Sequence, residues 1–99
     1  MTTALDRIFD ALASGPRRQI LAYLSEAELT TSQLAQRVGM STPAMSRHLS
    51  LLENAGLVSS ERHGQCVIHR LVRECLVDSL TNFASDICSV THPPELTSS

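Results

Sequence analysis

Two amphipathic helices are predicted for the first quarter of the chain from the spacing of its apolar residues. In the first, over about residues 3–13, apolar residues recur at positions i, i+3, i+4 and i+7. Residues 14–16 interrupt this pattern, and Pro16 suits the first position of a second helix, which fades near residue 26. The first helix has one apolar face, formed by Leu5, Ile8, Phe9 and Leu12, and the second is expected to turn Ile20, Leu21 and Leu24 inward.

Residues 30–58 contain two further helical patterns separated by a short break. Thr30 and Gln33 have the spacing of a capping box at the start of the first of them. Gly39 suits its end, because glycine readily adopts the left-handed conformation found there. Two short helices around a tight turn predict a helix-turn-helix, in which the second helix enters a DNA groove.

The second helix of this pair is expected to carry the recognition residues. It begins with Ser41 or Thr42 as the N-cap and Pro43 as the first helical residue, and Gly56 ends it. Its outward face is polar, with small side chains near the N-terminal end that allow a close approach to a major groove. The inward positions are Met45, Leu49 and Leu52, and the outward ones are Thr42, Pro43, Ala44, Ser46, Arg47 and Ser50.

The periodicity changes to that of strands after residue 56. Residues 57–62 and 65–71 are short extended runs around His63 and Gly64, which predicts a β-hairpin. A last helix is expected over about residues 72–87. The predicted fold class is therefore mainly α with a small β-hairpin: a winged helix-turn-helix of four helices, two strands and a closing helix.

The first and last helices have apolar faces that one chain of this size leaves uncovered. Pairing each with its copy across a two-fold axis buries both faces, so a homodimer is predicted. We assign residues 1–90 to one DNA-binding and dimerisation domain, and residues 91–99, which are polar and broken by prolines, to a flexible C-terminal tail. The expected interface residues are Leu5, Ile8, Phe9, Leu76, Leu80, Phe83 and Ile87.

Charge is distributed unevenly, although the net charge of the 99 residues is only −2. All eight basic residues are arginines, and five of them lie between residues 37 and 73, together with two acidic residues. A basic centre of this kind suits phosphates and guanine edges. No apolar run is long enough for a membrane span, and charges interrupt the apolar N-terminal stretch, so we expect a cytoplasmic protein.

Double-stranded DNA is the partner that these features predict. Thr42 and Ser46 can donate to phosphates or base edges, and Arg47 can reach guanine or phosphate. The basic hairpin tip suits the flanking minor groove or the backbone. His48 either touches DNA or is a half-buried structural residue, and Arg17 either holds a phosphate or supports the fold. The candidate DNA-binding residues are Thr42, Ala44, Ser46, Arg47, His48, Ser50, Arg62, His63 and Gln65.

Three cysteines, Cys66, Cys75 and Cys88, lack the spacing of a metal site and are expected to be reduced thiols. Cys75 and Cys88 are about 20 Å of helical rise apart on the last helix, so they cannot bridge within it. A redox switch through a Cys66–Cys75 bridge, or through a bridge between two copies, stays open. No phosphate-binding loop or nucleophile motif is present, so we expect neither an enzyme nor a cofactor.

Three segments carry a family resemblance: LASGPRRQIL, LTTSQLAQRVGMSTPAMSRHLSLLENAGLV and RHGQCVIHRL. Over about residues 5–83 they resemble the ArsR/SmtB family of dimeric winged-helix transcription repressors, most specifically in SRHL at residues 46–49 and LxxAGLV at residues 52–58. The end of the last helix, LVDSLTNF, is similar to the SdpR-like autorepressors. The resemblance implies a repressor that binds a palindromic operator.

The chain departs from the metal-sensing members of this family. Where they have a cysteine box of the form ELCVCDLA, this chain reads ELTTSQLA. His92 and Glu95 fit half of a second type of zinc site, but Ser79 and Thr81 stand where the other half is needed. His69 occupies a hairpin position that is usually aromatic. We therefore expect no metal site, and the sequence leaves the effector, whether a small molecule or a metal, unknown.

Two alternatives stay open from the sequence. One is a repressor that also senses thiol oxidation or a metal. The other is a winged-helix module that binds a protein and no DNA, which the net charge of −2 permits.

Overall fold

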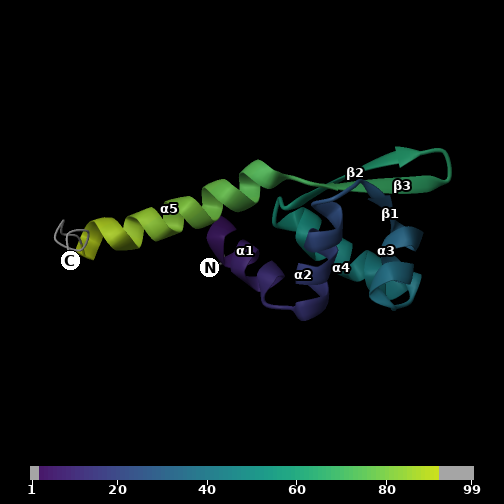
Figure 1. Ribbon diagram of the computed structural model, residues 1–99, viewed down its shortest axis with the longest axis horizontal. Coiled ribbons are helices and arrows are strands. Elements are labelled where there is room, and N and C mark those ends of the chain that lie inside the picture. Colours follow the sequence, from purple (N-terminus) through teal and green to yellow (C-terminus); the bar gives the residue numbers. More distant parts are fainter. Residues whose placement is uncertain (1–2, 92–99) are drawn as a thin grey trace.

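The computed structural model describes residues 3–91. Helices α1 to α4 pack around one core, and the last helix and the β-hairpin extend from it in opposite directions (Figure 1). The helices are α1 (Ala4–Leu12), α2 (Gly15–Leu24), α3 (Thr31–Val38), α4 (Thr42–Asn54) and α5 (Arg73–Thr91), and the strands are β1 (Leu29–Thr30), β2 (Val58–His63) and β3 (Cys66–Leu71). This order confirms the predicted winged helix-turn-helix, with one strand more than expected.

Side-chain caps fix where the helices begin. The capping box predicted for Thr30 and Gln33 is present, with reciprocal backbone-to-side-chain bonds of 2.8 and 3.1 Å. Thr3 and Asp6 form a second box at the start of α1. Each cap satisfies backbone N–H groups that the helix cannot, and contributes about 1 kcal/mol. Gly39 ends α3 with a φ of +84°, as predicted.

The core lies between α2, α3 and α4 and the base of the sheet. The inward positions predicted for α4 are confirmed, because Met45, Leu49 and Leu52 are all buried. Pro43 is the second helical residue of α4 rather than the first, since Ser41 is the N-cap and Thr42 follows it. The largest fully buried side chains among the described residues are Ile20, Leu34, Met45, Leu52 and Leu57.

The sheet has three strands instead of the two that were predicted. Strand β1 pairs antiparallel with β3 in the order β1-β3-β2, with Leu29 opposite His69 and Thr30 opposite Ile68. Two residues are too few to show an alternating pattern, and they directly precede the cap of α3, so the sequence could not reveal this strand. The hairpin itself is confirmed, and Gly64 in its turn has a φ of +65°.

Helix α5 is longer than the 72–87 span predicted for it and includes residue 91. The proposed flexible tail therefore falls mainly on residues 92–99, which lie outside the described residues, as do His92 and Glu95 of the half zinc site. No described helix is long and apolar enough to cross a membrane.

Candidate nucleic-acid interface

The outward face of α4 is solvent-exposed along its N-terminal half. Ser46, Arg47 and Ser50 are exposed, and Ala44 is half-buried beside them. The hydroxyl of Ser41 accepts a bond from the backbone N–H of Ala44 at 3.3 Å. Pro43 has no N–H and the N–H of Ala44 is bonded, so the exposed Thr42, with its backbone N–H and hydroxyl, is the residue of this helix start that suits a phosphate group. The residues predicted for this face are thus exposed, apart from the half-buried Ala44.

Arg17 and His48 connect this helix to the start of the chain. The Arg17 guanidinium donates to the carbonyl oxygens of Ala11 at 2.9 Å and Asp10 at 3.0 Å, and its Nη1 lies 3.2 Å from Nδ1 of His48. Because arginine has no acceptor, His48 Nδ1 must accept this bond, and the proton of the neutral ring resides on Nε2. Arg17 therefore supports the fold by capping the C-terminal end of α1, through carbonyls rather than through an ion pair.

The surroundings of His48 keep its ring neutral. Burial lowers its pKa below the usual 6.5, and the positive charges of Arg17 and Arg47 lower it further. The half-buried ring is neutral at neutral pH, with its Nε2–H still available as a donor. His48 thus bonds within the fold through Nδ1, and contact of its Nε2–H with DNA stays a prediction.

The wing, formed by β2 and β3, has two different faces because side chains alternate along a strand. Ser60 and Arg62 share one face with their cross-strand partners His69 and Val67. This is the face toward α4, since Ser60, Val67 and His69 line a small cleft together with Ser46 and Ser50 of that helix. Arg62 therefore lies on the side of the wing that the recognition helix also occupies.

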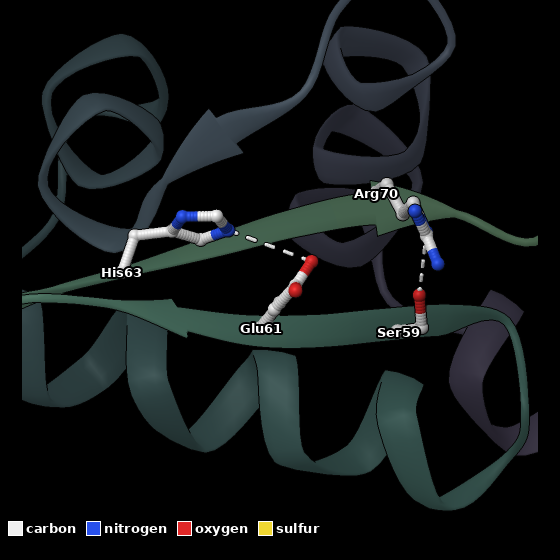
Figure 2. A network of polar contacts seen from close by, with 4 residues as sticks. All are labelled: Ser59, Glu61, His63 and Arg70. Carbon is white, nitrogen blue, oxygen red and sulfur yellow. Dashed lines mark hydrogen bonds and ion pairs between the residues drawn. The ribbon is translucent and has the colours of Figure 1, made fainter.

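His63 lies on the other face of the wing. Figure 2 shows it pointing toward Glu61, with Nε2 of His63 3.5 Å from the carboxylate, while Arg70 donates to the Ser59 hydroxyl at 3.0 Å. The structure therefore does not bring His63 together with Arg62, although the two are adjacent in sequence. Gln65 is exposed in the turn between the strands.

His69 is the buried polar residue that joins the wing to the helix-turn-helix. Only 5% of it is exposed, and its two ring nitrogens each lie 2.7 Å from a hydroxyl, Nε2 from Thr31 and Nδ1 from Ser60. Burial lowers its pKa, and the carboxylate of Glu53 opposes this shift in part. Sequence reasoning noted His69 only as a replacement for an aromatic residue, because its partners are 38 and 9 positions away.

Cys66 and Cys75 are free thiols and lie apart. Cys66 lies at the tip of the wing opposite His63, whereas Cys75 lies at its base, with its Sγ 3.7 Å from the Ala55 carbonyl oxygen. The strand between them spans roughly 16 Å, which is far beyond the separation that a disulfide tolerates. Among the described residues, no group of three potential metal ligands occurs.

An apolar stripe runs along α5 and continues onto α1. Val77, Leu80, Phe83 and Ile87 are between 36% and 57% exposed. Phe9 of α1 meets Phe83 edge-to-face with ring centroids 5.2 Å apart, and is itself 39% exposed.

Two of the expected interface residues are placed differently. Ile8 is 2% exposed within the core, so its side chain is not available to a second copy, and Leu76 packs against the same core. Leu5 is half-buried on α1.

The winged helix-turn-helix described above is also the fold of solved structures that are similar to this chain. The sequence pattern of the bacterial regulatory protein, arsR family, matches residues 14–60. The transcriptional repressor SdpR of Bacillus subtilis is 32% identical over 77% of this chain and 84% of its own length. The chain belongs to the ArsR family.

Two further comparisons agree with this assignment. The transcriptional regulator KmtR of Mycobacterium tuberculosis is 35% identical over 76% of this chain, which spans 61% of KmtR. The solution structure of the homodimeric winged helix-turn-helix DNA-binding domain of Mb0332 from Mycobacterium bovis superposes with a TM-score of 0.70. It is 29% identical and covers 84% of this chain and 79% of that one. The chain is therefore a DNA-binding transcriptional regulator, and its relatives are regulators rather than enzymes.

Proposed function

We propose that the protein is a cytoplasmic, homodimeric repressor that binds a palindromic operator, including one at its own promoter. The observation that carries this proposal is the exposed polar face of α4, with Arg62 of the wing on the same side. The name of SdpR as a repressor and the homodimeric state of Mb0332 support the direction of regulation and the assembly.

In this proposal, α4 reads the major groove of each half-site. Arg47 is exposed at the second turn of the helix and can reach a guanine edge or a phosphate. Ser46 and Ser50 present hydroxyls next to it, and Thr42 at the helix start binds a phosphate. The Nε2–H of His48 supplies one more donor. Arg62 holds the backbone that flanks the half-site, with Gln65 at the wing tip.

The second copy covers the apolar stripe of α1 and α5. Exposed apolar area of this kind costs free energy in water, and a two-fold axis allows the same stripe to cover itself. Phe9, Leu80, Phe83 and Ile87 form the centre of this interface, with Leu5 at its edge.

Selection of bound duplexes from a random pool tests the proposal directly. We expect an enriched inverted repeat whose half-sites are centred about one helical turn apart or a multiple of it. The duplex upstream of the protein's own gene is then tested for the same repeat. Failure to enrich any sequence at moderate salt would favour the protein-interaction module over the repressor.

The assignment of α4 is tested with Arg47→Ala. We expect operator affinity to fall by about tenfold or more, because each half-site then has one guanidinium fewer. The matched control is Arg70→Ala, which removes an arginine from the opposite face of the wing and leaves affinity nearly unchanged. Fluorescence anisotropy with a labelled operator measures the affinity of both variants. Equal losses of affinity would contradict the assignment of α4 as the recognition helix.

A further inference from the structure

A cavity of about 470 Å³ lies between α1, the turn that follows it and the C-terminal half of α4. Its size is within the range of small-molecule sites. The lining residues that matter here are Arg7, Asp10, Ala11, Arg17, Leu51 and Asn54. Leu51 is 50% exposed, although it stands on a helix whose other leucines are buried. Neither DNA recognition nor the dimer interface explains an apolar side chain at this place.

The cavity is separate from both proposed surfaces. Arg7 and Ala11 are each two positions from Phe9 on α1, so each points about 160° away from the side that contacts α5. Leu51 and Asn54 belong to the last turns of α4, beyond the N-terminal half that carries the recognition residues. A ligand here can bind while DNA and the second copy occupy their own faces.

The chemistry of the lining favours an organic anion with an apolar part. Two arginines, Arg7 and Arg17, line the cavity together with one acidic residue, Asp10. Within the described part of the chain, no hydrogen bond or ion pair engages the Arg7 side chain. Arg17 uses three of its five N–H groups on Ala11, Asp10 and His48 and has two left. A guanidinium and a carboxylate match in geometry, and Leu51 offers the apolar wall.

Occupancy of this cavity also bears on the recognition helix. Arg17 is one of the residues that line the cavity, and its Nη1 bonds His48 of α4 at 3.2 Å. A bound carboxylate that attracts the Arg17 guanidinium weakens the hydrogen bond between Arg17 and His48. Because this bond connects α2 to α4, the position of α4 is then less firmly fixed. A ligand that binds the free form better than the DNA-bound form must lower operator affinity by the same factor.

We propose that this cavity is an effector site for a small organic monocarboxylate with an apolar body, whose binding lowers operator affinity through Arg17 and His48. Binding of the carboxylate to the cavity does not depend on the proposed function, whereas its effect on operator affinity rests on that function.

The binding step is tested with sodium benzoate and sodium hexanoate as probes. Titration of the ¹⁵N-labelled full chain, followed by amide NMR, should give saturable shifts centred on Ala11, Leu51 and Asn54 at concentrations up to about 20 mM. Neutral benzamide at the same concentrations should give much smaller shifts. No saturable shift with either carboxylate, equal shifts with benzamide, or shifts centred elsewhere would each overturn the proposal.

Two variants with a matched control locate the site. Arg7→Gln removes one charge from an exposed position and should weaken benzoate binding at least about fivefold. Leu51→Trp should fill the cavity and abolish the saturable shifts. Arg70→Gln removes an exposed charge from the wing and should bind benzoate as the wild type does. Equal binding by Arg7→Gln and Arg70→Gln would show that the arginine charge at this cavity is not used, which contradicts the proposal.

The effect on DNA is measured by operator anisotropy with and without saturating benzoate, with sodium chloride matched between samples. We expect benzoate to lower the operator affinity of the wild type by about fivefold or more. The operator affinity of Leu51→Trp should be the same with and without benzoate. If the protein binds both benzoate and the operator, and benzoate does not change operator affinity, the effector role is wrong and the proposed function is unaffected. A chain that binds benzoate and no operator overturns the proposed function and confirms the cavity.

Discussion

At the scale of single residues, two histidines hold this fold in their neutral form. His48 accepts a bond from Arg17, which an imidazolium cannot do, and His69 is buried between two hydroxyls. Neither contact is visible in the sequence, because His48 lies 31 positions from Arg17 and His69 lies 38 positions from Thr31. Local patterns identify where a histidine is placed on its helix or strand, but only the packed fold brings it to a distant partner.

The neutral histidines predict that stability falls in weak acid. Both pKa values are lowered in the folded state, so below about pH 6.5 the unfolded chain takes up protons that the folded chain does not. Stability is therefore highest above this pH and is lost as the pH falls toward the folded-state values. Urea unfolding at pH 7.5 and 5.5, at one protein concentration, measures the difference. His48→Gln keeps an acceptor for Arg17 without titrating, so its pH dependence should be smaller, and an unchanged slope would contradict this account.

The bonds of His69 predict a large cost for its removal. His69→Ala leaves the hydroxyls of Thr31 and Ser60 without their partner and opens a cavity, which should lower the free energy of unfolding by about 2–3 kcal/mol. His63→Ala on the same hairpin is the control, because His63 is exposed and its removal should cost less than about 0.5 kcal/mol. Similar urea midpoints for the two variants would show that the buried bonds contribute little.

At the scale of elements, the helices were predictable and the sheet only in part. Periodicity and caps located α1 to α4 within a few residues, since the signal for each, such as Thr30 with Gln33 or Gly39, lies within the element itself. The faces of the wing were not predictable, because Arg62 and His63 are neighbours that point to opposite sides. Pairing with β3 decides which of them faces α4.

The two faces of the wing predict opposite outcomes for its two arginines. Arg62→Ala should weaken operator binding about tenfold and lower the salt dependence by about two counterions per dimer, because each subunit then neutralises one phosphate fewer. Arg70→Ala should change neither quantity, because Arg70 is bonded to Ser59 on the other face. Operator titrations at several salt concentrations measure both. A reduced salt slope for Arg70→Ala, or an unchanged one for Arg62→Ala, would mean that the wing approaches DNA with its other face.

At the scale of the whole molecule, α5 is the helix whose apolar side a single chain leaves largely uncovered. It extends from the body next to α1 (Figure 1). Its apolar stripe is exposed to solvent. The spacing of apolar residues predicted this stripe. The same spacing also assigned Ile8 and Leu76 to the interface, although both pack in the core of their own chain. A periodic pattern shows which side of a helix is apolar and does not show whether the same chain or a copy covers it.

Breaking the stripe should separate assembly from folding. Phe83→Glu puts a charge in the centre of the proposed interface and should give a folded monomer, because the core around Leu34 and Leu52 lies elsewhere. Asn82→Glu adds the same charge one residue earlier, outside the stripe, and should remain a dimer. Light scattering compares each variant with the 10.8 kDa mass of one chain, and circular dichroism checks that the helices are retained.

The monomer presents only one α4 to the operator and should bind at least about 100-fold more weakly. A Phe83→Glu protein that stays dimeric, or a monomer that binds the operator as well as wild type, would show that α5 does not set the two recognition helices.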